Sequence, residues 1–339
     1  MLEKLKSLCE INGTSGREEK VREYIIEKVK GKGEYHVDPL GNLIVSVKGK
    51  RPAKNKVMLS AHMDEVGFII TYITDDGFLK FDCVGGVDEK VVAGRTLLVG
   101  DNEIPGVVGI RAIHLTEKSE EGKVPPLSKM YIDIGAKNKE EAEKYVSIGD
   151  SAYFISDFKL FGNNKVKSKA IDDRFGCALM LDMIEKGVEF DAVFAFLVQE
   201  EVGLRGAGAA AYTVKPDYSI VLEATTAADV AGVSGSDCVC SLSKGAVVAF
   251  MDRSTIYNRE MFKRAFELAK ENDIPCQTKT AVAGGNDAGA IHKSLGGVYT
   301  INVSLPCRYI HSATSIADLS DMQSCRKLAE VLLSEFADA

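Results

Sequence analysis

The chain has 339 residues, 45% of them hydrophobic and 27% charged, which is the composition of a globular protein rather than a disordered one. Its formal net charge of -7 argues against nucleic-acid binding, because proteins that contact the phosphate backbone carry a basic face. No segment approaches the roughly 20 apolar residues of a membrane span, and the N-terminus lacks an apolar stretch of signal-peptide length. We therefore expect a cytoplasmic protein that acts on small molecules or peptides, with no membrane or nucleic-acid partner.

Two helices are expected at the start of the chain. Leucines repeat at helical spacing over residues 2–8. A turn at 13–16 follows, and Ser15 and Glu18 have the spacing of a capping box, in which each side chain bonds the other residue's backbone N–H. This pattern predicts a second helix that begins near Glu18 and runs through Lys30.

Four short apolar runs are typical of strands buried on both faces, as in a parallel sheet. They lie at residues 57–61, 192–198, 218–222 and 298–303. Helical stretches lie between or after them, at residues 177–186, 206–213, 258–272 and 319–337. Strands that alternate with helices predict an α/β fold, with a mostly parallel sheet flanked by helices on both faces.

The amino-acid composition changes over residues 71–161. This stretch is rich in Gly, Val and Ile, with turn signals at 75–77 and at Gly85-Gly86 and a polar loop at 117–122. Short strands with close turns predict a small all-β module inserted into the α/β domain. Residues 1–70 and 162–339 would then form one discontinuous domain.

Histidine and carboxylate side chains follow the predicted strands or precede a helix. Ligands bind at the carboxyl ends of strands in an open parallel sheet, so groups at those ends are expected to meet at one edge. Four different strands deliver such groups here, which is hard to assign to chance. The clusters are His62-x-Asp64, Asp172-Asp173, Glu200-Glu201, Glu223 and His311.

Each cluster by itself has an ordinary structural explanation. His62 and Asp64 could form a local hydrogen bond, whereas in a metal site His62 binds the ion and Asp64 holds the ring. Asp172-Asp173 could be a charged helix start. Adjacent Glu200 and Glu201 could begin a solvated loop, or could divide the roles of ligand and general base. His114 and His292 lack acidic companions at useful spacing and are interpreted as structural, and His36 is interpreted in the same way because it lies in a turn-rich segment at residues 35–39.

The donor types indicate which metals would fit. Two imidazoles with several carboxylates suit zinc, cobalt or manganese better than calcium, which prefers cages made only of oxygen. No cysteine falls in the clusters, which argues against a closed structural zinc site. The eight cysteines are scattered and are expected to be free thiols in a reducing compartment. Mixed ligands with open positions suit metal-assisted hydrolysis.

Five motifs, in order along nearly the whole chain, together resemble the tetrahedral aminopeptidase family. That family includes glutamyl and deblocking aminopeptidases, and some relatives are named cellulases or endoglucanases. The resemblance implies a zinc-peptidase-like α/β domain with an inserted β-barrel used in oligomer contacts. It also implies peptide substrates and a homo-oligomer, with a dodecamer as one candidate size. The motifs are His62-Met-Asp-Glu-Val-Gly67, Ile171-Asp-Asp-Arg174, Gln199-Glu-Glu-Val-Gly-Leu-Arg-Gly206, Gly284-Gly-Asn-Asp-Ala288 and Arg308-Tyr-Ile-His-Ser312.

The resemblance also implies a ligand set for two divalent metal ions per subunit, with zinc or cobalt as the expected metals. His62 and Glu223 would hold one ion. Glu201 and His311 would hold the second, and Asp172 would bridge the two. Many family members carry Asp at the position of Glu223, so the additional methylene bears on the spacing of the site.

The remaining roles are implied in the same way. Glu200 would be the general base, and Asp64 would orient the neighbouring histidine. The bond between Asp172 and Asp173 would be cis. Asn286 stands where the family commonly has Thr, near the expected substrate side of the site.

Three other functions compete with a metal-dependent aminopeptidase. A glycoside hydrolase also uses two carboxylates, but the chain has no Trp for sugar stacking and would leave two histidines without a role. A related dinuclear deacylase or carboxypeptidase generally carries its additional domain later, between the fourth and fifth ligands. A non-catalytic scaffold is expected to lose a ligand or Glu200, and none is missing.

Overall fold

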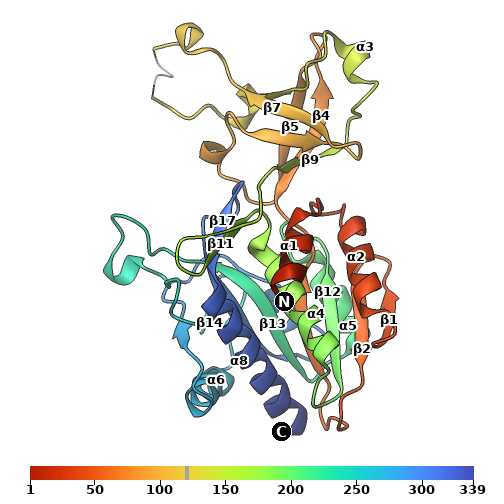
Figure 1. Ribbon diagram of the computed structural model, residues 1–339, viewed down its shortest axis with the longest axis vertical. Coiled ribbons are helices and arrows are strands. Elements are labelled where there is room, and N and C mark those ends of the chain that lie inside the picture. Colours follow the sequence, from red (N-terminus) through yellow and green to blue (C-terminus); the bar gives the residue numbers. More distant parts are fainter. Residues whose placement is uncertain (119–121) are drawn as a thin grey trace.

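A computed structural model describes residues 1–118 and 122–339. It is a mixed α/β structure with a closed six-stranded antiparallel barrel, which confirms the expected fold class. Figure 1 shows the barrel, coloured orange to yellow, at one end of the long axis, with both termini in the α/β part. The polar loop expected at 117–122 includes residues 119–121, which lie outside the described residues.

The large sheet has eleven strands in the order β1-β2-β12-β3-β13-β16-β17-β11-β10, with β14 and β15 beside β16. Its four central strands, β12, β3, β13 and β16, are parallel to one another, and the strands on either side of them pair antiparallel. The bounds are β1 (Glu34–Val37), β2 (Leu43–Val47), β3 (Val57–His62), β10 (Lys159–Phe161), β11 (Lys165–Ser168), β12 (Ala192–Leu197), β13 (Tyr218–Thr226), β14 (Ala246–Val248), β15 (Cys276–Thr278), β16 (Tyr299–Arg308) and β17 (Ser315–Asp318).

The four apolar runs all form strands, but two of these strands, β13 and β16, extend several residues beyond their apolar runs. Strands β13 and β16 pair in continuous register from Tyr218 opposite Tyr299 to Thr226 opposite Cys307. Glu223 therefore lies inside β13 rather than after it, because hydrogen bonding to the neighbouring strand extends the element past its apolar part. His36, expected in a turn-rich segment, lies in the edge strand β1.

Helices cover both faces of the sheet. Leu59 and Leu222 pack in the main core with helix α4, whereas Met58 and Val221 pack on the opposite face with α5 and α7. Since side chains alternate along a strand, His62 and Glu223 point to the α5 and α7 face. The bounds are α1 (Leu2–Glu10), α2 (Glu19–Val29), α4 (Ile171–Lys186), α5 (Arg205–Val214), α6 (Arg259–Glu271), α7 (Ala288–Ile291) and α8 (Leu319–Asp338).

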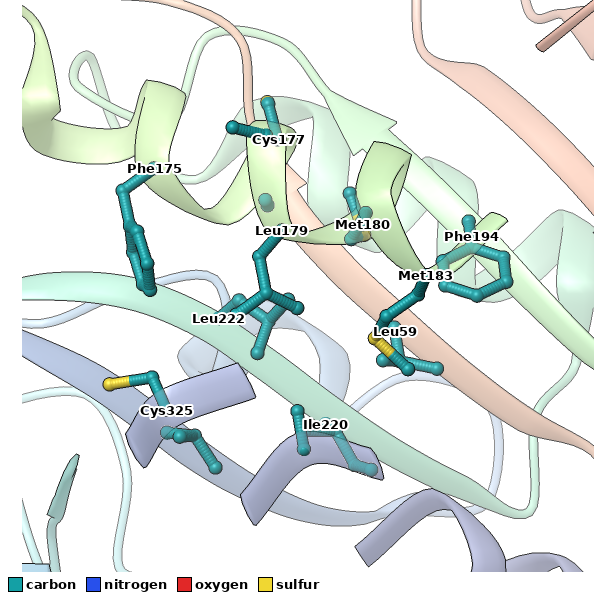
Figure 2. Packing of buried hydrophobic residues seen from close by; sticks show 14 of the residues in the cluster. Leu59, Phe175, Cys177, Leu179, Met180, Met183, Phe194, Ile220, Leu222 and Cys325 are labelled. Carbon is teal, nitrogen blue, oxygen red and sulfur yellow. The ribbon is translucent and has the colours of Figure 1, made fainter. Parts of the chain in front are cut away.

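The main core holds α4 against the central strands. Figure 2 shows Leu179 of α4 above Leu222 of β13, and Met183 beside Leu59 of β3. These side chains are almost completely buried. Removing such a side chain from water is worth roughly 1.5–3 kcal/mol. This packing fixes the start of α4 relative to the ends of the central strands.

The barrel has its own core. The ring centroid of Phe68 lies 5.1 Å from those of both Phe81 and Phe154. Both pairs have the edge-to-face arrangement that aromatic rings favour. Strand β10 belongs to the large sheet rather than to the barrel. The barrel strands are β4 (Gly67–Ile73), β5 (Leu79–Val84), β6 (Thr96–Val99), β7 (Ile104–Gly109), β8 (Tyr131–Asp133) and β9 (Ser151–Phe154), and a short helix α3 (Lys139–Ala142) lies between the last two.

The predicted capping box at the second helix is wrong. Helix α2 begins at Glu19 and has no side-chain cap. The Ser15 hydroxyl instead donates to Asp64 (2.6 Å), and the Glu18 carboxylate accepts from the backbone N–H groups of Gly16 (2.8 Å) and Gln199 (3.0 Å). Partners distant in sequence have displaced the local ones.

All eight cysteines are free, as expected. Over the described ranges, no helix has both the length and the apolar character needed to cross a membrane.

Candidate metal centre

The predicted site residues meet at the carboxyl end of the central strands. His62 ends β3, and Glu223 stands in the last part of β13. Glu200 and Glu201 follow β12, and His311 follows β16. Asp172 lies at the start of α4, where the backbone angles of two residues are not helical and the bond to the next residue, Asp173, is cis.

Asp172 lies between the two histidines, with one oxygen near each. Its Oδ1 is 3.2 Å from His62 Nε2, and its Oδ2 is 3.4 Å from His311 Nε2. Glu223 Oε1 lies 3.5 Å from His62 Nε2, and Glu201 Oε2 lies 3.5 Å from His311 Nε2. The donors thus form two groups that share one carboxylate.

Both imidazole rings present Nε2 to the carboxylates because Nδ1 is occupied. His62 Nδ1 lies 3.0 Å from the carbonyl oxygen of Asp64 and 3.4 Å from its Oδ1. His311 Nδ1 lies 2.9 Å from the carbonyl oxygen of Gly86. A carbonyl oxygen beside Nδ1 can only accept a proton from it, so Nε2 is the ring nitrogen that would be available to an ion, which is how metal-binding histidines are usually held.

Asp64 connects His62 to the loop after β12. Its Oδ1 accepts the backbone N–H of Glu200 (3.1 Å) and its Oδ2 accepts that of Glu201 (3.1 Å). Burial raises the pKa of Asp64, but the hydrogen bonds from His62 and Ser15 outweigh burial and hold the pKa below its usual value. A charged Asp64 therefore fixes three candidate site residues at once.

The carboxylates of the two groups lie close together and away from water. Burial, together with the nearby carboxylate of Asp172, raises the pKa of Glu223 to about 8 and that of Glu201 to about 7. Burial also raises the pKa of Glu200 well above its usual value, although His62 opposes the shift. These directions show that the negative charges of the cluster are poorly compensated by the protein itself.

The pKa values of the two imidazoles are also raised, which for a histidine favours the charged form. Burial lowers the pKa of His311, but the hydrogen bond to Asp172 and the charge of Glu201 outweigh burial and raise the pKa to about 9. Burial likewise lowers the pKa of His62, and the charge of Glu223 with the other carboxylates raises it well above its usual value. The centre therefore attracts positive charge.

The donor chemistry fits divalent cations. Within residues 1–118 and 122–339, no Lys or Arg forms an ion pair with Asp172, Glu200, Glu201 or Glu223. Buried carboxylates without a cationic partner are costly, and a metal ion would relieve that cost. Nitrogen and oxygen donors in this mixture suit zinc or cobalt.

Two further carboxylates lie at the centre, and neither is predicted from the sequence as a metal ligand. Donor atoms of His62, Asp173 and Glu223 all lie within 4.8 Å of one another, so Asp173 is a second candidate ligand beside Asp172. Asp287 is 1% exposed, and its Oδ1 has no hydrogen-bond partner in the described part of the chain. Burial raises the pKa of Asp287 to about 7. No predicted strand precedes Asp287, and although it stands in the motif at residues 284–288, that motif assigns it no role.

Asn286, expected near the substrate side, is buried. Its Oδ1 accepts the backbone N–H of Ala288 (2.9 Å), and its amide donates to the hydroxyl of Tyr257 (3.1 Å). The residue thus holds the start of α7 through hydrogen bonds within the protein.

Residues 41–328 match the family described as M42 glutamyl aminopeptidase. A protein of Acetivibrio thermocellus, provisionally named an aminopeptidase, is 44% identical over 331 residues, which are 97% of each chain. A TET aminopeptidase from a marine sediment archaeon of the Thaumarchaeota has a TM-score of 0.94 at 32% identity, covering 99% of this chain and 96% of that one.

Two other solved structures carry names that bear on assembly and substrate. The TET1 peptidase of Pyrococcus horikoshii, which can assemble into a tetrahedron or a large octahedral shell, has a TM-score of 0.85 at 35% identity and 98% coverage of both chains. A structure from Thermotoga maritima named endoglucanase has a TM-score of 0.80 at 36% identity, covering 98% of this chain and 96% of that one.

Proposed function

Since the chain belongs to the M42 glutamyl aminopeptidase family, and is thereby a peptide hydrolase, we propose that it removes N-terminal residues from peptides with two divalent metal ions, zinc or cobalt. One observation carries the proposal: the two oxygens of Asp172 each face a different imidazole, His62 and His311. A single carboxylate shared between two donor groups is the arrangement that a pair of ions requires.

Each ion has its own residues in this proposal. His62 and Glu223 hold one, Glu201 and His311 hold the other, and Asp172 bridges them. The distances of 3.2–3.5 Å between the Nε2 atoms and the carboxylate oxygens support this division. The longer side chain of Glu223 still reaches His62 from inside β13, so the methylene that distinguishes it from Asp leaves a complete donor set.

Glu200 is the residue that accepts and then donates the proton. When bound, the ions supply Lewis acidity and lower the pKa of a reacting water. Glu200 Oε2 lies 3.9 Å from His62 Nε2, beside the donor groups rather than within them. Its carboxylate accepts a proton from the water that attacks the first peptide carbonyl, and then donates that proton to the departing amine. Asp64 keeps Glu200 in place through the backbone N–H.

The requirement for a free N-terminus follows from the charge of the cluster. Within the described residues, the cluster's carboxylates form ion pairs with histidines but with no Lys or Arg, and this excess of acidic groups favours the positively charged amino end of a peptide over an acetylated end. We therefore assign the enzyme as an exopeptidase. The name endoglucanase of one similar structure offers a glycoside hydrolase as the alternative, but neither the absence of Trp nor the two ordered imidazoles suits that chemistry.

One experiment separates these functions. A short peptide is offered free and N-acetylated, with and without a chelator, and the products are read by mass spectrometry. We expect sequential loss of single residues from the free peptide, a large fall in kcat/KM on acetylation, and loss of activity with the chelator. Internal cuts, or equal cleavage of the acetylated peptide, would contradict the proposal. Hydrolysis of a soluble cellulose that persists with the chelator would favour the glycoside hydrolase.

We also propose that the enzyme acts in the cytoplasm as a homo-oligomer, with a dodecamer as a candidate size, and that the barrel is its assembly domain. The eight unpaired cysteines support a reducing compartment. Three apolar side chains of the β7–β8 connection are exposed: Ile110 by 42%, Ile113 by 90% and Leu115 by 59%. Apolar side chains gathered on one exposed segment are typical of a surface that another chain covers.

Charged substitutions at this segment test the assembly proposal. The double variant Ile113→Glu with Leu115→Glu should give a folded protein of smaller mass in light scattering, because burying two carboxylates at an interface is unfavourable. Leu160→Glu is the matched control, since Leu160 is 56% exposed on β10 in the α/β part and should leave the mass unchanged. A double variant with the original mass would show that this segment does not hold the assembly together.

A further inference from the structure

The barrel contributes an atom to the candidate metal centre. Gly86 lies in the connection between β5 and β6 of the barrel. Its carbonyl oxygen accepts the Nδ1–H of His311 at 2.9 Å, across 225 residues of sequence. The two histidines therefore differ: His62 is held by Asp64 of its own loop, whereas His311 is held by a different part of the fold.

Glycine is required at the start of this connection. Gly85 has φ of +84°, and a Cβ built there would lie 2.9 Å from Val66 Cγ1 and 3.2 Å from Glu201 Cβ. A residue with a side chain at position 85 would have to adopt an unfavourable positive φ, and its Cβ would lie close to Glu201, one of the proposed ligands. The turn thus lies directly against Glu201, and its neighbour Gly86 lies against His311, the two residues of the same donor group.

His311 depends on this contact more than His62 does. Its side chain is 38% exposed, whereas that of His62 is 1% exposed. Its backbone has φ of +58° just after β16 ends, so no helix or strand fixes the direction of its ring. Phe154 and Val66, at the barrel, line a cavity of about 10 Å³ together with Asp172, Glu201 and His311. Residues at the barrel therefore line this side of the centre.

We infer that the turn at Gly85 and Gly86 is part of the catalytic centre: the Gly86 carbonyl positions His311, so that the barrel sets the affinity of the second metal site. The inference rests on the proposed function. It assigns the barrel a role in the chemistry in addition to assembly. It also means that excising the barrel would remove an outer partner of one metal ligand, whatever happened to the mass of the assembly.

The test is Gly85→Ala against Gly94→Ala. Gly94 also lies in the barrel with a positive φ, of +74°, but a Cβ there meets nothing within 4 Å. Both variants carry the same kind of backbone strain, and only Gly85→Ala pushes the turn away from Glu201 and His311. Metal-free protein is titrated with zinc by calorimetry, and the thermal midpoints of both variants are recorded.

We expect wild-type protein and Gly94→Ala to bind two zinc ions alike. Gly85→Ala should keep one site and weaken the other about 10–100-fold, the usual effect of losing an outer partner of a ligand. Equal binding by Gly85→Ala and wild type, or equal weakening of both sites, would overturn the inference while leaving the proposed function intact. Wild-type protein that binds no zinc or cobalt would overturn the proposed function itself.

A second measurement needs no variant at position 85. In the zinc-loaded wild-type protein, the imidazole nitrogens are observed by ¹⁵N NMR and His311 is assigned by its loss in His311→Gln. The chain has five histidines, which keeps the spectrum simple. The inference requires a proton on Nδ1 of His311. A proton on Nε2 instead would contradict it.

Discussion

Replacing Glu200 with glutamine is expected to lower kcat at least about a hundredfold while both metal ions stay bound. Glutamine has the shape of glutamate but cannot accept a proton from water. A hundredfold loss corresponds to about 2.7 kcal/mol of transition-state stabilisation. The backbone N–H of residue 200 would still donate to Asp64, so the loop after β12 should keep its position.

The neighbouring residue supplies the contrast for this prediction. Glu201→Gln makes the same chemical change one position along, at a residue whose Oε2 lies 3.5 Å from His311 Nε2. It should lose metal as well as activity, since the carboxylate is a proposed ligand. Metal content after dialysis, measured by mass spectrometry, separates the two variants. Near-normal turnover of Glu200→Gln, or its loss of metal, would show that Glu200 is not the base.

Replacing Asp172 with asparagine is expected to weaken both metal sites together and to abolish measurable activity. Its two oxygens face two imidazoles, and an amide supplies neither the negative charge nor two equivalent oxygens. The loss of affinity should exceed the about 10–100-fold typical of losing an outer partner, because a bridging ligand touches both ions. Calorimetric titration with zinc measures both sites in one experiment.

Asp173→Asn is the control, and it also tests the alternative ligand. Asp173 Oδ1 accepts the backbone N–H of Gly176 at 3.0 Å, and the residue is fully buried. If Asp172 is the bridge, Asp173→Asn should keep two bound ions. If Asp173→Asn loses them while Asp172→Asn retains them, the neighbouring carboxylate is the ligand and the proposed division of residues is wrong.

The gross plan of the protein was readable from local patterns. Apolar runs such as 57–61 have the length and composition of doubly buried strands, and the helical stretches between them fix an α/β arrangement. Polar groups such as His62 and Glu201 were noticeable because they directly follow apolar runs. The carboxyl ends of parallel strands meet at one edge, so sequence position alone predicted that these groups converge.

Local patterns failed where a distant partner competed with a near one. Ser15 and Glu18 have capping-box spacing, but Ser15 donates to Asp64 and Glu18 accepts from Gln199, so the helix starts without a cap. The sequence predicts that Glu223 follows its strand, but β13 extends beyond Glu223 because it pairs with β16 there. A local hydrogen bond contributes only about 1 kcal/mol. A hydrogen bond to a charged or better-oriented partner that folding brings close can therefore replace it.

The orientation of the donors was decided only by the tertiary structure. Residue types and spacing indicate that histidines and carboxylates are present at the ends of strands, but not which oxygen faces which nitrogen. The position of Asp172 between the two histidines follows from how α4 packs on the central strands, and the ring of His311 is held by a hydrogen bond to the carbonyl group of Gly86. Every residue carries a backbone carbonyl group, so no local sequence pattern identifies the carbonyl that orients a proposed ligand. Only folding brings the Gly86 carbonyl within hydrogen-bonding distance of the His311 ring.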